Sequence, residues 1–223
     1  MIVTIHQPDF LPWLGFFDRW KRSDFFIVLD DVQFLRRGWH HRDRIKTASG
    51  VQWLTVPVRK KGKYAQTIRE VLIDNNRDWR KKHLRTIESA YRSAPNFERV
   101  FLALERVYAG ENKRLIDLNM ELLRFCARRM GIAVPTAFSS QWTVSGTGTR
   151  RLVELVAARG GDVYLTGLGS RDYLERGPFS DAGIKVAWQE FDHPVYPQLH
   201  GAFEKGLSVL DYLMNVQDKE AWN

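Results

Sequence analysis

The first 31 residues constrain the fold of this chain more than any other stretch. Residues 1–5, "MIVTI", form an apolar run that suits a buried strand, and residues 25–31, "FFIVLDD", form a second run that ends in two acids. Residues 14–22 between them fit a short helix. Parallel strands need such a crossover, so strand, turn, helix and strand in this order indicate a parallel sheet. We therefore predict an α/β fold with a mostly parallel, Rossmann-like sheet.

The rest of the chain continues this pattern around a long helical interruption. Further strands are predicted at 51–58, 132–140, 162–167 and 184–191, with a short one at 69–74, and helices at 150–161 and 207–216. In residues 78–130, apolar residues recur every three to four positions, as in amphipathic helices. We expect one domain over residues 1–223, with a helical insertion or sub-domain at about 78–130.

Composition restricts the class of protein. Apolar residues make up 44% of the chain, enough for a real core. The single cysteine, Cys126, excludes a disulfide within the chain and a CxxC metal site, and its spacing from Leu122 and Leu123 predicts a small buried side chain. We expect no metal site. No apolar stretch approaches the roughly 20 residues of a membrane span, and the start lacks the features of a signal peptide. We expect a cytoplasmic protein without a transmembrane segment.

The basic charge is confined to one segment. Residues 36–85 contain 15 Lys and Arg against 4 Asp and Glu, a net charge of +11, whereas the whole chain carries +8. Such a concentration attracts phosphate-bearing partners, including nucleotides, sugar nucleotides and nucleic acid. The alternative is a solvated basic face. Arg42, Arg44 and Lys46 alternate, so an extended chain would point them to one side, toward a diphosphate or, with Trp39 as a stacking platform, RNA.

The first loop of the predicted sheet is unusually restrained. "HQPDFLPWLG", residues 6–15, contains two prolines and ends in Gly15, which fix the backbone while permitting close approach. Ligands of open parallel sheets bind at the carboxyl ends of strands, where this loop lies. We interpret the restraint as preorganisation of a site that holds His6, Gln7 and Trp13. The alternative is a rigid turn with a structural histidine.

Four other loops also follow strands or precede helices. Asp31, in "DDVQF", suits a ribose hydroxyl, an amine or a metal, or else caps the next turn. Ser145 and Gly146 precede a helix whose amides could hold an anion, although a simple helix cap explains them equally well. Gly167 and Gly169, two apart after a predicted strand, resemble half of a dinucleotide fingerprint, and Arg171 could meet a phosphate or carboxylate there. The stretch at 191–201 repeats the style of the first loop, with His193 as a general base or a structural histidine. We expect these two proline-rich turns to meet in space and to hold His6 and His193 around a common pocket.

Seven stretches together resemble the WbqC-like proteins, in order and along nearly the whole chain. They are "HQPDFLPWLGFFDRW", "FFIVLDDVQF", "RDRIKT", "WLTVPV", "YLTGLGSRDYL", "AGIKVAWQEFDHPVYPQL" and "LSVLDYLMN". The family is known from bacterial gene clusters for O-antigen and other surface polysaccharides, and from natural-product clusters. The resemblance implies transfer of an amino-acid-derived acyl group, notably glycyl, to a nucleotide-linked amino sugar. Two loops depart from the usual family form, "GWHHRDR" in place of an Asn-rich "NRNR" and "GLGS" in place of "GPGG", which implies a different substrate.

The resemblance implies a set of site residues. His6 or His193 would be the base, with Asp31 orienting it or binding the ammonium, and Arg42, Arg44 and Lys46 would hold the diphosphate. The acyl donor stays open between aminoacyl-tRNA, a carrier thioester and an acyl adenylate. The remaining substrate-binding candidates are Gln7, Trp13, Gly15, Gln33, Ser145, Gly146, Gly167, Gly169, Arg171, Asp172, Tyr173, Tyr196 and Gln198.

Two alternatives come from other classes of protein. The opening P-x-x-x-P-W-x-G resembles the first turn of the HIGH-type nucleotidylyltransferases and class I synthetases, which implies an ATP- and Mg²⁺-dependent transferase or ligase. However, Phe16 stands where a histidine is expected. The second alternative is a non-catalytic RNA-binding module that uses the basic segment and its tryptophans. For the transferase itself, no cofactor is implied.

Overall fold

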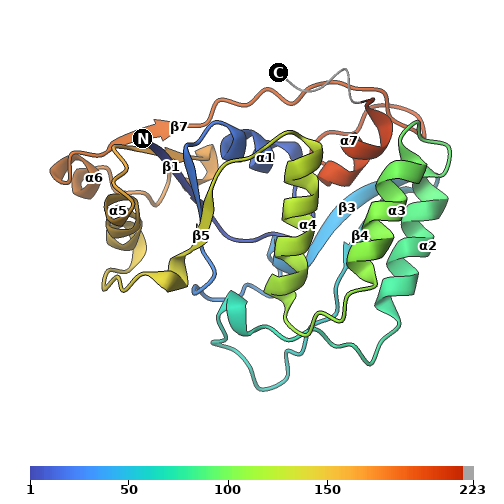
Figure 1. Ribbon diagram of the computed structural model, residues 1–223, viewed down its shortest axis with the longest axis horizontal. Coiled ribbons are helices and arrows are strands. Elements are labelled where there is room, and N and C mark those ends of the chain that lie inside the picture. Colours follow the sequence, from blue (N-terminus) through green and yellow to red (C-terminus); the bar gives the residue numbers. More distant parts are fainter. Residues whose placement is uncertain (218–223) are drawn as a thin grey trace. The chain divides into compact units, whose positions relative to one another are not determined.

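The computed structural model describes residues 1–217 (Figure 1). The chain falls into two compact units. Unit 1 consists of Met1–Gln7, Gly15–Asp31 and Ile132–Asp192, and unit 2 of Pro8–Leu14, Val32–Gly131 and, among the described residues, 193–217. The helices of the expected 78–130 block fall in unit 2. The expectation of a single domain stays a prediction.

Unit 1 contains a five-stranded parallel sheet. Its strands are β1 (Ile2–His6), β2 (Phe25–Val28), β5 (Thr136–Phe138), β6 (Val163–Thr166) and β7 (Lys185–Trp188). They lie in the order β5-β2-β1-β6-β7, and each neighbouring pair is parallel. By chain position this order is 3-2-1-4-5, which reverses direction between β1 and β6 as in a Rossmann fold. The predicted fold class is confirmed, since five of the six predicted longer strands form this sheet.

Helices cover both faces of this sheet, because successive strand residues point to opposite sides. On one face α1 (Leu14–Lys21) packs its aromatic side chains, and the Trp20 ring stacks 4.6 Å from that of Phe26. On the other face Val3 and Ile27 form a core with Val156 of α5 (Gly148–Ala158) and Phe179 of α6 (Gly177–Asp181). Burial of such a side chain contributes about 1.5–3 kcal/mol.

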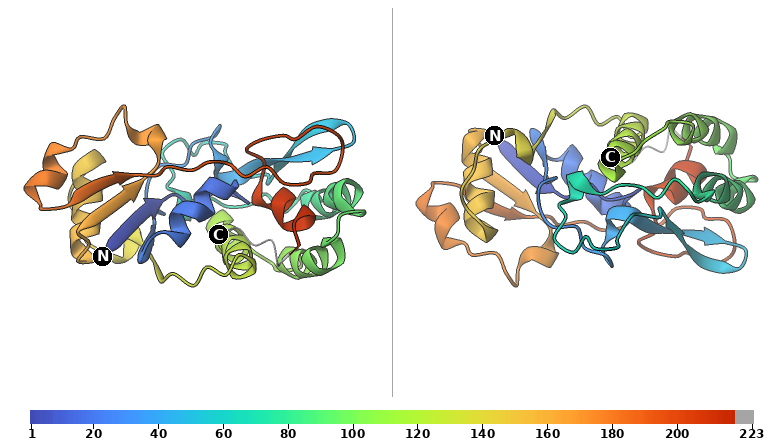
Figure 2. Two further views of the ribbon diagram at one scale, coloured as in Figure 1. Left: turned by 90° about the horizontal axis from the view of Figure 1, so that it is seen from above. Right: turned by 90° about the horizontal axis from the view of Figure 1, so that it is seen from below.

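Unit 2 combines a β-hairpin with helices. Strands β3 (Arg42–Thr47) and β4 (Gly50–Thr55) pair antiparallel, and Gly50, with φ of +98°, allows the tight turn between them. The strand predicted at 51–58 is thus β4, outside the parallel sheet. Helices α2 (Trp79–Tyr91) and α7 (Val209–Asn215) pack against β3, and α3 (Phe97–Tyr108) packs against α2, α7 and α4 (Leu115–Arg129). Figure 2 shows the hairpin beside the loop that precedes α7.

The prediction of a short strand at 69–74 is wrong. Residues Ile68–Glu70 form a 3₁₀ turn, because Glu70 accepts hydrogen bonds from the backbone and hydroxyl of Thr67. Beyond this turn only isolated bridges form, at Leu72 and Ile73.

The predicted helical block is confirmed as α2, α3 and α4, whose buried faces form the core of unit 2. Cys126 of α4 is fully buried, as predicted, and burial raises the pKa of its thiol. In the described residues, no helix is both long and apolar enough to cross a membrane.

Candidate functional site

His6 occupies the point in unit 1 where the order of the sheet reverses. It is the last residue of β1, which pairs with β2 on one side and β6 on the other. Its Nδ1 donates a hydrogen bond to the carbonyl of Gln7 at 2.8 Å, and its ring packs edge-on against Phe16 at 4.7 Å. In the neutral imidazole, a proton on Nδ1 leaves the lone pair on Nε2. The contact with Gln7 therefore orients the ring at the end of β1.

The loop after β6 ends at the same edge of the sheet. A side chain at Gly167 would come within 2.5 Å of the guanidinium of Arg19, whereas one at Gly169 would meet nothing within 4 Å. The guanidinium of Arg171 lies 5.3 Å from the ring of Trp188, the last residue of β7. This edge therefore offers cations and an aromatic ring, with open space beside Gly169. Two further predicted residues, Asp172 and Tyr173, are exposed in this loop.

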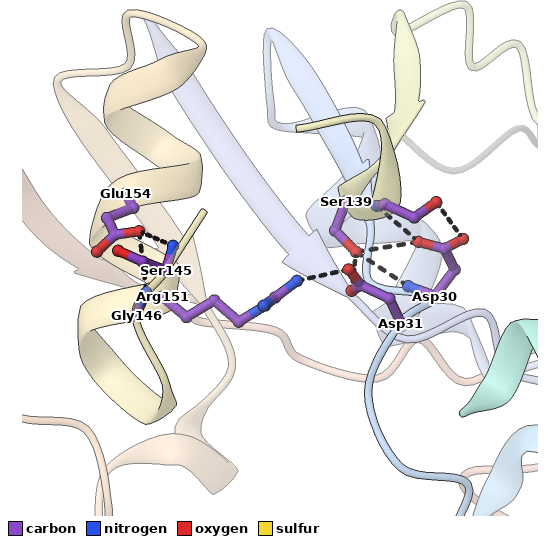
Figure 3. A network of polar contacts seen from close by, with 8 residues as sticks. Asp30, Asp31, Ser139, Ser145, Gly146, Arg151 and Glu154 are labelled. Carbon is purple, nitrogen blue, oxygen red and sulfur yellow. Dashed lines mark hydrogen bonds and ion pairs between the residues drawn. The ribbon is translucent and has the colours of Figure 1, made fainter. Parts of the chain in front are cut away.

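Asp30 and Asp31, at the end of β2, are held by side chains of unit 1 (Figure 3). The buried carboxylate of Asp30 accepts hydrogen bonds from the amide and the hydroxyl of Ser140, at 3.0 and 2.7 Å. Asp31 accepts from Ser139 at 2.6 Å and forms an ion pair with Arg151 of α5, also at 2.6 Å. The two acids thus tie the ends of β2 and β5 together, and Asp31 adds α5. This geometry suits a positioning role for Asp31.

The expected anion cradle before α5 already has an anion from the chain itself. The amides of Ser145 and Gly146 donate to the carboxylate of Glu154, at 2.9 and 3.1 Å (Figure 3). A side chain at Gly146 would come within 2.8 Å of this carboxylate and of the amide of Arg151. The glycine is therefore explained by close packing, and the loop is a cap for its own helix.

The proline-rich loop of residues 8–14 belongs to unit 2, and several hydrogen bonds fix it there. Asp9 accepts from Nδ1 of the buried His40 at 3.0 Å, and the amide of Phe10 donates to the carbonyl of Trp39. Asn119 of α4 donates to the carbonyls of Pro8 and His40. Together these bonds anchor the loop to the 3₁₀ turn Trp39–His41 and to α4.

The backbone of the same loop is also strained. Leu11 is fully buried and has a φ of +46°, a conformation that costs a non-glycine residue about 1–2 kcal/mol. Gly15, just beyond the loop, lies in unit 1, where its carbonyl accepts from Gln189.

His193, in unit 2, uses both ring nitrogens within that unit. Nδ1 donates to the carbonyl of Pro194 at 2.9 Å, and Nε2 accepts from the amide of Gly206 at 3.3 Å. The ring stacks between Trp13 and Tyr196, and burial lowers its pKa. These contacts are those of a structural brace. Because His6 belongs to unit 1, the expected meeting of the two histidines in one pocket stays a prediction.

Other candidates on the loop before α7 make internal contacts. The buried ammonium of Lys46 donates to Gln198 and to the carbonyls of Gly201 and Ala202. Gln198 in turn bonds to the backbone of Glu204. Tyr196 donates to the buried Asp211. Lys46 therefore stabilises this loop. Of the three alternating cations of β3, Arg42 and Arg44 are the two that lie over the ring of Trp53.

Arg42 and Arg44 lie against two aromatic rings. The guanidinium of Arg42 is 4.5 Å from the ring of Trp53, and that of Arg44 lies 5.9 Å from Trp53 and 5.8 Å from Trp39. Arg42 also donates to the carbonyl of Arg37. As their alternation predicts, Arg42 and Arg44 point to the same side of β3, where both lie over the ring of Trp53. Gln33, also in unit 2, donates to the carbonyl of Tyr64.

Some residues of these surfaces were not foreseen from the sequence. The sequence patterns do not indicate roles for Arg36, Trp53, Lys60 or Trp188. The position of Trp53 opposite Arg44 follows only once β3 and β4 are recognised as an antiparallel hairpin. Within residues 1–217, no group of three or more His, Cys, Asp or Glu is placed to hold a metal ion.

Comparisons with known proteins agree with the resemblance seen in the sequence. Residues 7–222 match the WbqC-like protein family. The chain is 38% identical over 216 residues to uncharacterized protein Rv1507c of Mycobacterium tuberculosis (strain ATCC 25618 / H37Rv), covering 96% of this chain and 93% of the relative. No solved structure matches. The chain belongs to the WbqC-like protein family.

Proposed function

We propose that this protein is a transferase that forms an amide between an amino-acid-derived acyl group, such as glycyl, and the amine of a nucleotide-linked amino sugar. The product would enter surface-polysaccharide (O-antigen) or natural-product biosynthesis, in the cytoplasm. Membership of the WbqC-like family supports this reading. It fits a sheet of Rossmann order, which is a common platform for nucleotide ligands.

The observation that carries the proposal is the position of His6. Ligands of open parallel sheets bind outside the carboxyl ends of the strands, where the strand order reverses. His6 ends β1 at this reversal, beside β6, and its contact with Gln7 orients the ring. A base at this position is what an attack by an amine requires.

The chemistry needs one proton acceptor. The amino group of a sugar is largely an ammonium at neutral pH, and it attacks only after it loses a proton. In the proposed step Nε2 of His6 takes this proton, the nitrogen bonds to the acyl carbon, and the bond from that carbon to the donor breaks. His6 is preferred to His193 for this role because it ends β1 at the reversal of the strand order, where ligands of such sheets bind.

Neighbouring groups of unit 1 supply charge and shape for the nucleotide. Arg171 lies over Trp188, and the space beside Gly169 is open, so a diphosphate can approach the backbone there. Asp31 acts indirectly in this proposal, because Ser139 and Arg151 already hold its carboxylate.

A product assay tests the proposal. The purified protein is incubated with a panel of nucleotide-linked amino sugars and with three donors in turn: aminoacyl-tRNA, an acyl-carrier thioester, and free amino acid with ATP and Mg²⁺. Mass spectrometry should detect an acylated sugar nucleotide with at least one donor. Release of pyrophosphate from ATP without acyl transfer would favour the nucleotidyl-transfer alternative, and no product with any pair would contradict the proposal.

A further inference from the structure

One surface of unit 2 combines cations with exposed aromatic rings. We call it the Arg–Trp face, and it consists of Arg36, Trp39, Arg42, Arg44, Trp53 and Lys60. Its members form two groups of contacts. In the first, Arg36 donates to the carbonyl of Lys60 at 3.0 Å, and its guanidinium lies 4.3 Å from the ring of Tyr64. In the second, Arg42 and Arg44 lie over Trp53, and the ring of Trp39 is 5.4 Å from that of Trp53. The two groups are near enough for the charge of Arg42 to lower the pKa of Lys60.

The positive charge of this face is not balanced by neighbouring acids. Residues 36–63 contain nine Lys and Arg and a single acid, Asp43. Burial raises the pKa of Asp43 to about 8, so this carboxyl is largely neutral at pH 7. Among residues 1–217, no ion pair joins a cation of the face to a carboxylate. Burial, then Arg36 and Arg42, lower the pKa of Lys60, as expected where cations crowd together.

The aromatic rings of the face remain accessible. Trp39 and Trp53 are each 46% exposed, and Tyr64 is 75% exposed. Large aromatic side chains at a surface are typical of sites that stack on flat ligands. Proteins that bind single-stranded nucleic acid combine such rings with cations that follow the backbone phosphates. A single diphosphate needs two or three cations, whereas this stretch supplies eight besides the internally bonded Lys46, which suits a polyanion.

We propose that the Arg–Trp face binds single-stranded RNA, with bases stacked on Trp39 and Trp53 and phosphates paired with Arg36, Arg42, Arg44 and Lys60. The role of this RNA rests on the proposed function. If the protein is the proposed acyl transferase, the acyl donor is an amino acid esterified to the single-stranded 3′ end of a tRNA.

The donor reaction balances without a further reagent. The deprotonated amine of the sugar attacks the ester carbonyl, so a C–N bond forms and the C–O bond to the terminal ribose breaks. The leaving ribose oxygen takes up a proton, and the products are an amide and uncharged tRNA. The energy of the ester drives the step, so ATP is not consumed by this protein.

Fluorescence anisotropy with a short, labelled single-stranded RNA ending in CCA tests the binding. Trp53→Ala should weaken binding about tenfold, as expected for the loss of one stacked base. The double variant Arg42→Gln/Arg44→Gln should reduce the slope of log affinity against log salt by about 1.4, or about 0.7 for each lost phosphate contact. Arg85→Gln is the control, since it removes one exposed cation of the same basic segment from α2.

Three outcomes would overturn the inference: no RNA binding by the wild type at low salt, effects at Trp53 and Arg42/Arg44 no larger than at Arg85, or full displacement of RNA by inorganic diphosphate at equal phosphate concentration. Circular dichroism melting verifies that each variant folds. Transfer assays separate the two proposals. Amide formation that survives ribonuclease treatment of the donor mixture refutes the RNA donor alone, whereas RNA binding without amide formation from any donor refutes the transferase alone.

Discussion

Arg151 Nη2 lies 2.6 Å from Asp31 Oδ2, and this ion pair joins α5 to the end of β2 across 120 residues of sequence. The two side chains are only 21% and 19% exposed. The pair is therefore poorly screened by solvent, and removal of one partner leaves a largely buried charge.

Replacement of Arg151 should destabilise unit 1. We expect Arg151→Met to lower the free energy of unfolding by about 1–3 kcal/mol, less than for a fully buried pair because solvent reaches both groups. Urea unfolding measures this change. In a double-mutant cycle, Asp31→Asn should cost much less in the Arg151→Met background than in the wild type, and additive costs would show that the pair is not coupled.

Asp43 offers a stabilising substitution. Burial raises its pKa to about 8 from an unfolded value of 3.8, so between these values the unfolded chain ionises and the folded chain does not. This difference lowers stability as the pH rises from about 4 to 8. Asp43→Asn keeps an oxygen for the amide of Arg44 and removes the penalty. We expect a gain of about 1–3 kcal/mol at pH 7 and little gain at pH 4. A loss of stability at pH 7 would mean that the ionised form is the stable one.

His41 and His83 should produce the opposite pH dependence. Burial lowers the pKa of each from 6.5 to about 4, so below pH 6.5 the unfolded chain takes up protons that the folded chain does not. Their contribution to stability is complete above pH 6.5 and is lost as the pH falls toward 4. Nuclear magnetic resonance titration should find both imidazoles neutral at pH 5.5. Unfolding measured in the Asp43→Asn variant isolates the contribution of the two histidines to stability, because Asp43 then no longer titrates. A titration midpoint near pH 6.5 for either imidazole would contradict the prediction.

Two glycines in the loop after β6 form a matched pair. Gly167→Ala places a methyl group within 2.5 Å of the guanidinium of Arg19, whereas Gly169→Ala meets nothing within 4 Å. Neither backbone has a positive φ. Because the near atom is the end of a flexible side chain that is itself buried, we expect a loss of about 0.5–1.5 kcal/mol for Gly167→Ala, at the low end for overpacked sites, and almost no change for Gly169→Ala. Thermal unfolding compares them, and equal effects would show that Arg19 moves aside without cost.

The sequence predicts the parallel sheet well because its strands are short apolar runs with clear boundaries. The runs that became β1, β2 and β6 are largely buried and that of β7 is partly buried, and no long-range information is needed to recognise such continuous apolar runs. The run that became β4 looks the same in isolation. Its antiparallel partner β3 decides where it lies, and that pairing is not visible in local apolarity.

The partners of polar side chains are the part that the sequence does not predict. The sequence predicts that Lys46 holds a diphosphate, but its ammonium donates hydrogen bonds to the carbonyls of Gly201 and Ala202, more than 150 residues away in the sequence. Ser145 and Gly146 were expected to cradle an external anion, but Glu154 supplies an internal one. In both cases residue type indicates the charge that a group prefers, whereas the tertiary fold determines which group provides it.

The role of His6 is tested most directly by the rate of amide formation in two histidine variants. With a donor and sugar nucleotide that the wild type uses, His6→Gln should reduce the rate by about a hundredfold or more, the usual contribution of a general base. His193→Gln should retain most of the rate of the wild type wherever circular dichroism shows a folded protein, since its nitrogens bond to the backbone. Full activity of His6→Gln, or a comparable loss in a folded His193→Gln, would contradict the assignment of His6 as the base.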